Sequence, residues 1–391
     1  MNEIKIRNKV IIWGKDGYNV LGLLRQLHAY AEVYFLMVGG SRFCAVKSKY
    51  CKNLVKTSNF DEGLKWLMES FSNEEHKPFI ITTGDLAAEY VDQHYDVLSK
   101  WFFITGTSQQ GQLTKVDDKA YMNNIAVECG FKIPQSIVCN KHTDISRVQY
   151  PCILKPLNKH SGHESPFKTK ICNDKTELQD VINKIEEGAT LLLQEFVPKK
   201  ADALVYGCRT FSGEVILAGV IVRNRWDGAD SGDGSFGYIT DELPSRISKN
   251  SIERFLQEIA YYGLFSVEYG ITDMEAYFYE FNLRNDGTSN YFNQAGCNIP
   301  LIWIMDTIGA DYSQLAQSVT GKHIYIAEDD DYINVKKGVI TKEQYKKDLA
   351  SATVFRRYDP DDMKPYYYNK LLLRIMPVRR YIREILMRFK K

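Results

Sequence analysis

The first forty residues constrain the fold most strongly, because apolar strands and a helical segment alternate there. KVIIW at 9–13 has the length of a buried strand, and the segment after it continues as a glycine turn and an amphipathic helix. EVYFLMV at 32–38 is a second apolar run, and two more follow at 79–85 and 101–106. Because strand–helix–strand units form parallel sheets covered by helices, residues 1–110 are predicted to form an α/β domain.

The glycine turn of this segment does not match a dinucleotide-binding fingerprint. Gly14, Gly17 and Gly22 do not fit the G-x-G-x-x-G spacing, and no acidic residue follows the second strand to hold a ribose. Arg42 lies near enough in sequence to meet a 2′-phosphate. A structural turn is therefore the favoured interpretation, and a nicotinamide-dependent oxidoreductase is the alternative.

Composition excludes several classes of protein. The 391 residues are 44% hydrophobic with a formal net charge of +1, so no overall charge favours a nucleic acid partner. The eight cysteines include no C-x-x-C pair, which favours reduced thiols over a zinc site. We expect a cytoplasmic protein, because no signal peptide and no apolar run of about 20 residues is recognisable.

A predicted hairpin carries the strongest chemical signal of the chain. Strands recur after residue 130, and Glu268 and Glu280 lie on two of them, joined by the turn GITDMEA. Glu280, Asn282 and Arg284 share one strand face because side chains alternate along a strand. Two carboxylates and an amide are ligands that suit Mg²⁺, whereas a solvated face of an antiparallel sheet is the alternative.

The order of short motifs before this hairpin resembles that of a known superfamily. DDK at 117–119, ILKP at 153–156 and LLLQEF at 191–196 precede it. The series from about residue 9 to about residue 305 resembles the ATP-grasp carboxylate-amine ligases, nearest to D-aspartate ligase-like and surface-polysaccharide-associated members. The resemblance implies a Rossmann-like N-terminal domain followed by an α+β ATP-grasp fold, with a lid subdomain at 111–192 and a metal and substrate subdomain at 193–320.

The resemblance also implies residues that bind ATP. Two lysines would contact phosphates, a hinge would hold the adenine, and an acid would meet the ribose. These residues are Lys119, Lys155, Gln194, Glu195, Phe196, Val197 and Asp202. Many members have a multi-glycine loop after the second lysine, but here PLNKHSGHESPFK at 156–168 has only Gly162. His160 and His163 in this segment lack the further ligands of a zinc site.

The metal and the transferred phosphoryl group are assigned in the same way. Glu268, Glu280 and Asn282 match the metal ligands of the superfamily, with two Mg²⁺ ions expected and Mn²⁺ as a substitute. Arg284 and Arg225 are expected to neutralise the developing negative charge, with Arg223 as the alternative to Arg225. The substrate pocket is expected to involve four residues of the following segment, namely Asn285, Ser289, Asn290 and Tyr291.

The implied activity is ATP-dependent amide formation through an acyl phosphate. The expected substrates are a carboxylate and an amine, and the product would join an amino acid or small amine to a cell-wall or surface-polysaccharide precursor. A D-aspartate-type peptidoglycan ligase is the narrower alternative, and a non-catalytic ATP-binding regulatory module is the alternative from another class. A homodimer is also compatible with the resemblance.

The C-terminal segment is expected to be an extension with its own helix. Residues 321–391 end in LLLRIMPVRRYIREILMRFKK, in which apolar residues recur at helical spacing beside a basic face. Such a helix either packs on the body of the protein or attaches to a membrane surface.

Overall fold

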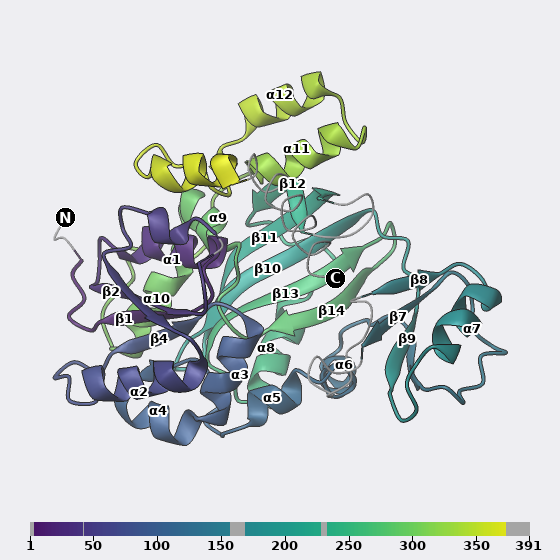
Figure 1. Ribbon diagram of the computed structural model, residues 1–391, viewed down its shortest axis with the longest axis horizontal. Coiled ribbons are helices and arrows are strands. Elements are labelled where there is room, and N and C mark those ends of the chain that lie inside the picture. Colours follow the sequence, from purple (N-terminus) through teal and green to yellow (C-terminus); the bar gives the residue numbers. More distant parts are fainter. Residues whose placement is uncertain (1–3, 42, 157–168, 228–232, 373–391) are drawn as a thin grey trace, which may run out of the picture.

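The computed structural model describes residues 4–41, 43–156, 169–227 and 233–372 (Figure 1). Arg42, the segment 157–168 with its two histidines, most of the acidic loop before Gly234, and the predicted amphipathic helix lie outside the described residues. Within the described ranges, no helix is both long enough and apolar enough to span a membrane.

The N-terminal part is a parallel sheet with helices, as predicted. Its strand order is β3-β2-β1-β4-β5. The strands are β1 (Val10–Gly14), β2 (Val33–Val38), β3 (Asn53–Thr57), β4 (Phe79–Thr82) and β5 (Phe103–Ile104), and the helices are α1 (Tyr18–Leu27), η1 (Ala45–Lys47), α2 (Phe60–Phe71), α3 (Asp85–Gln93) and α4 (Tyr95–Trp101). Every residue of β1 is buried, because this strand pairs on both sides.

A small antiparallel sheet forms a second unit, at the opposite end of the molecule from the N-terminal sheet (Figure 1). It contains β6 (Ser136–Cys139), β7 (Cys152–Pro156), β8 (Lys170–Cys172) and β9 (Leu191–Glu195) in the order β6-β9-β7-β8, together with α7 (Lys175–Asn183). This unit has a core of its own, which includes Leu154, Leu178 and Leu193. All eight cysteines lie among the described residues, and none of them is paired in a disulfide there.

A seven-stranded sheet lies between these two units. Its order is β14-β13-β10-β11-β12-β15-β16. The strands are β10 (Ala201–Arg209), β11 (Val215–Trp226), β12 (Gly234–Thr240), β13 (Gly263–Ile271), β14 (Ala276–Asn282), β15 (His323–Ile326) and β16 (Val354–Phe355). The accompanying helices are α5 (Gln112–Val116), α6 (Lys119–Glu128), α8 (Lys249–Glu258), α9 (Ser289–Gln294), α10 (Ile299–Thr307), α11 (Glu328–Lys336) and α12 (Lys342–Ser351).

The C-terminal region contributes to this sheet, which the sequence analysis did not anticipate. β15 pairs with β12, and β16 pairs with β15. Residues 321–355 are therefore part of the central unit and not of a separate extension. Their strands are short, two to four residues long, and so give little periodic signal in the sequence.

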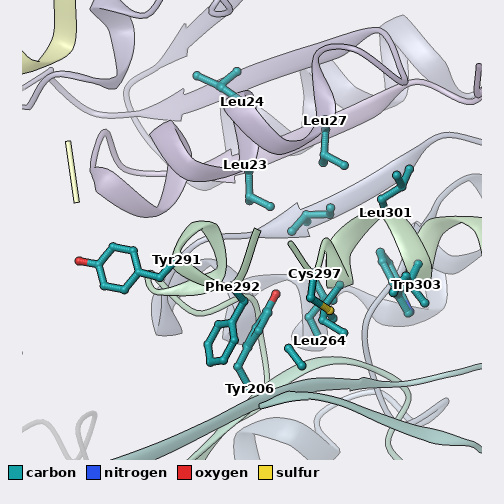
Figure 2. Packing of buried hydrophobic residues seen from close by; sticks show 14 of the residues in the cluster. Leu23, Leu24, Leu27, Tyr206, Leu264, Tyr291, Phe292, Cys297, Leu301 and Trp303 are labelled. Carbon is teal, nitrogen blue, oxygen red and sulfur yellow. The ribbon is translucent and has the colours of Figure 1, made fainter. Parts of the chain in front are cut away.

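One hydrophobic core joins the N-terminal sheet to the central sheet. Leu23 and Leu27 of α1 face Phe292 of α9 and Leu301 of α10, and Tyr206 of β10 completes the layer (Figure 2). All five side chains are buried to 99% or more. The first 110 residues and the central sheet are thus packed on each other through apolar contacts.

Candidate active site

The predicted hairpin is confirmed, and it pairs the two carboxylates directly. Glu268 on β13 is opposite Glu280 on β14, and Asn282 is opposite Ser266. Burial raises the pKa of Glu268 to about 7, with Arg223 acting against this shift and the Glu280 charge adding to it. Two facing acids therefore oppose full ionisation in this protein, which is the arrangement that a bound cation relieves.

The oxygen ligands on the hairpin suit Mg²⁺, which shares its coordination with nucleotide phosphates, better than a metal that is coordinated by protein side chains alone. Among the described residues, no three His, Cys, Asp or Glu side chains gather in a way that would hold a metal. Mg²⁺ usually binds one or two carboxylates together with nucleotide phosphates. Glu268, Glu280 and the amide oxygen of Asn282 fit that ligand set.

The geometry corrects the preference for Arg225. Its Nε and Nη2 donate to Asp331 at 2.7 Å each, and Nη2 also meets Asp348 at 2.8 Å, so this guanidinium is held by α11 and α12. Arg223 Nη1 instead lies 3.7 Å from Glu268 Oε1. A register irregularity between the two arginines breaks the alternation that would have placed them on one face. Arg223 therefore replaces Arg225 in the candidate site.

Arg284 is held by a residue of the N-terminal domain that the sequence analysis missed. Its Nε donates to Asp85 Oδ1 at 2.7 Å, and its Nη2 donates to Asn282 Oδ1 at 3.1 Å. Asp85 begins α3 directly after β4, at the carboxyl end of the parallel sheet, where such folds usually bind ligands. Its position just after β4 was the feature of the sequence that could have identified Asp85 as a site residue. Both residues line a pocket between α3, α5, α6 and the end of β14.

Lys155 carries the clearest electrostatic signature of a phosphate site. Its Nζ donates to Gln194 Oε1 at 2.8 Å and lies 5.4 Å from the centroid of the Tyr279 ring. Burial, followed by the positive charge of Lys119, lowers the pKa of Lys155 to about 8, and the Glu280 charge opposes this shift. Lys155, Lys119 and Glu280 are therefore electrostatically coupled, although they come from different units of the fold.

The binding of Mg–ADP is expected to weaken as the pH rises above about 8. We expect phosphate oxygens to bind the charged form of Lys155, and the free protein loses that charge with a pKa of about 8. Above the pKa, the lysine must therefore take up one proton for each Mg–ADP bound, and the affinity falls by about tenfold per pH unit. Calorimetric titration between pH 7 and 9.5 measures it. In Lys155→Met the affinity should be lower and this slope absent, and a wild-type slope in that variant would contradict the assignment.

The hinge residues lie where the chain passes from the small sheet to the central one. Gln194 and Glu195 end β9, Val197 is buried, and Phe196 is half-buried. Asp202 already has polar partners, because Lys199 Nζ lies 2.7 and 2.8 Å from its two oxygens. A ribose at Asp202 would have to share this carboxylate with the lysine.

The four residues expected to line the substrate pocket instead connect α1 and α9 to the central sheet. Tyr206 Oη donates to Asn285 Oδ1 at 2.7 Å, and Gln26 Nε2 donates to Ser289 Oγ at 3.1 Å. Tyr291 Oη accepts from Arg356 Nε at 2.7 Å. Each of the four residues is at most 5% exposed, namely Asn285, Ser289, Asn290 and Tyr291. The expectation of a pocket at these positions is therefore corrected to a packing role.

Asp286, which was not among the predicted site residues, lies close to Glu268 on the hairpin. Ser266 Oγ donates to its Oδ2 at 2.9 Å, and the backbone N–H of Thr288 donates to its Oδ1 at 2.8 Å. Its charge contributes to raising the pKa of Glu268. Asp286 thus adds negative charge at the same end of the hairpin.

Comparisons with known proteins agree with the observed fold. No family model matches the chain. A D-aspartate ligase of Enterococcus faecium (strain Aus0004) is 22% identical over 328 residues, which is 76% of each chain. A solved N5-carboxyaminoimidazole synthetase from Staphylococcus aureus is 15% identical, with a TM-score of 0.63 over 88% of this chain and 89% of that one. An L-amino acid ligase from Bacillus licheniformis is 12% identical, with a TM-score of 0.59 over 79% and 76%.

Proposed function

Because the chain has the ATP-grasp fold, we propose that it is an ATP-dependent carboxylate-amine ligase that uses Mg²⁺. The observation that carries the proposal is the pairing of Glu268 with Glu280 on one hairpin, with Asn282 beside them and Lys155 in electrostatic reach. Carboxylates that hold a metal and a half-buried lysine that meets phosphates are the parts that such a reaction needs. The D-aspartate ligase and L-amino acid ligase relatives support the same class of activity.

The reaction proceeds in two steps that need no nucleophile from the protein. A substrate carboxylate oxygen attacks the γ-phosphorus of ATP, and the bond from that phosphorus to ADP breaks, which leaves an acyl phosphate. The amine then attacks the acyl carbon, inorganic phosphate leaves, and the nitrogen loses a proton to give the amide. Mg²⁺ neutralises phosphate charge when bound. Lys155, Arg223 and Arg284 orient the anionic groups and stabilise their charge.

The narrower proposal concerns the substrates. We infer that one substrate, the acceptor, is a precursor of the cell wall or of a surface polysaccharide. The other substrate, which is joined to the acceptor, is an amino acid or a small amine. The D-aspartate ligase relative supports this choice, because the similarity extends over 76% of both chains. A D-aspartate-type peptidoglycan ligase is the most specific form of the proposal. Use of ATP agrees with the cytoplasmic location expected from the sequence.

The test is ADP release that depends on both substrates. The protein is incubated with ATP, Mg²⁺, pooled amino acids including D-aspartate, and cell-envelope precursors, and condensation products are identified by mass spectrometry. The proposal predicts a product heavier than an acceptor by one amino acid or amine less water, with one ADP per product. Tight Mg–ATP binding without any product, across all pools, would instead support the non-catalytic module.

A further inference from the structure

Arg223 is a half-buried cation with open donors. The Arg223 side chain is 12% exposed, and its one ion pair within the described part of the chain is the contact of 3.7 Å with Glu268. That separation is too long for a hydrogen bond, and no described residue accepts one from this guanidinium. A guanidinium has five N–H donors, and those that no protein group accepts from remain available to a ligand. The arrangement is therefore suited to an anion.

A second donor, which is fully buried, lies beside it. Tyr325 on β15 is 1% exposed, and its hydroxyl has no hydrogen-bond partner among the described residues. Burial raises the pKa of this phenol, so the hydroxyl keeps its proton at neutral pH and can donate it. Buried polar groups without partners are rare in folded proteins and call for an explanation. Tyr325 comes from the C-terminal region, which the sequence analysis had treated as an extension.

Two glycines bring the two donors together. A Cβ on Gly234 would lie 2.5 Å from Arg223 Cδ and 2.7 Å from the Tyr325 hydroxyl. A Cβ on Gly237 would lie 2.9 Å from the Tyr325 ring and 2.0 Å from the Val222 carbonyl oxygen. A side chain at Gly234 would push the tyrosine and the arginine apart, and one at Gly237 would displace the tyrosine ring. The glycines of β12 thus have a specific structural purpose next to the metal-site carboxylates.

We propose that Tyr325 and Arg223 together bind one oxyanion during the reaction, with the tyrosine hydroxyl donating to an oxygen that the guanidinium also contacts. The oxyanion is either the phosphoryl group in transfer or the substrate carboxylate, both of which must lie beside Glu268. Preorganised donors at such a position stabilise charge without reorganisation. This inference rests on the proposed function, and it adds a substrate-contacting residue from β15 to the site.

Anion binding to the Mg–ADP complex tests the proposal. Inorganic phosphate and acetate are titrated separately into the wild-type protein and into Tyr325→Phe, each saturated with Mg–ADP, and dissociation constants are measured by calorimetry. Loss of a hydrogen bond to a charged group predicts binding weaker by about tenfold or more in the variant. A loss confined to phosphate assigns the site to the phosphoryl group, and a loss confined to acetate assigns it to the substrate carboxylate.

Tyr269→Phe is the matched control. Its hydroxyl is also buried without a described partner, but Tyr269 belongs to the apolar cluster on the other face of β13. Both variants should melt no lower than the wild type, because each loses a hydroxyl that has no partner. Equal anion affinities in Tyr325→Phe and the wild type would overturn the inference, as would the absence of saturable binding of either anion. Failure of the wild type to bind Mg–ADP would instead overturn the proposed function.

Discussion

Glu280→Gln is expected to lower Mg²⁺-dependent ADP release by roughly 10²–10³-fold, the range found when one stabilising group is removed from a preorganised site. The amide keeps the shape of the side chain but removes one of the two facing charges on the hairpin. Without that charge, the proposed metal site keeps only Glu268 as an anionic ligand. The measurement is ADP release in a coupled assay with saturating substrates, repeated at increasing Mg²⁺ concentration.

Glu275→Gln is the control for this substitution, since it makes the same chemical change on the same hairpin. Glu275 is in the turn region and forms an exposed ion pair with Lys132 at 2.7 Å. Exposed pairs of this kind contribute little to stability, so turnover and folding should stay close to the wild type. Wild-type turnover in Glu280→Gln would show that the hairpin carboxylates do not hold the metal.

Phe292→Ala is expected to destabilise the protein by about 3–5 kcal/mol, the usual cost of removing a fully buried aromatic ring. Phe292 is 0% exposed and stacks on Tyr206 with ring centroids 5.3 Å apart, between α1 and the central sheet (Figure 2). The cavity would form in the layer that joins two units of the fold. Urea unfolding followed by circular dichroism should give a clearly lower midpoint.

Phe211→Ala is the control, because it removes a phenyl ring of the same size from the protein surface. Phe211 is 72% exposed, and surface substitutions usually change the free energy of unfolding by about 0.5 kcal/mol or less. A midpoint for Phe292→Ala that matched that of Phe211→Ala would mean that the shared core contributes little to stability.

Local patterns predicted the parts of the site that depend on regular geometry. The two apolar runs around GITDMEA correctly indicated a hairpin. The direct pairing of Glu268 with Glu280 depends on a register irregularity next to Glu268, because the register set at the turn would place Tyr279 opposite Glu268. The β–α–β opening correctly indicated the parallel sheet. β3 was missed, because its residues are half-buried or exposed and carry no apolar run.

Features that depend on irregular or distant contacts could not be predicted in this way. Alternation favoured placing Arg223 and Arg225 on one face, but the irregularity between them sends Arg225 to Asp331, more than 100 residues later. Asp85 meets Arg284 across 199 positions in the sequence. Such pairs are fixed by the packing of one unit on another, which periodicity within a segment does not report.

The core shared by α1, α9, α10 and the central sheet limits how this protein can be divided. Its members come from both sides of residue 110, including Leu23 on one side and Tyr206 on the other. Cutting the chain there would leave each fragment with a large apolar face that water must cover. The boundary near residue 110 is therefore not a position at which the chain can be divided into two stable fragments. Replacing the N-terminal unit with another would also require new core residues on the central unit that packs against it.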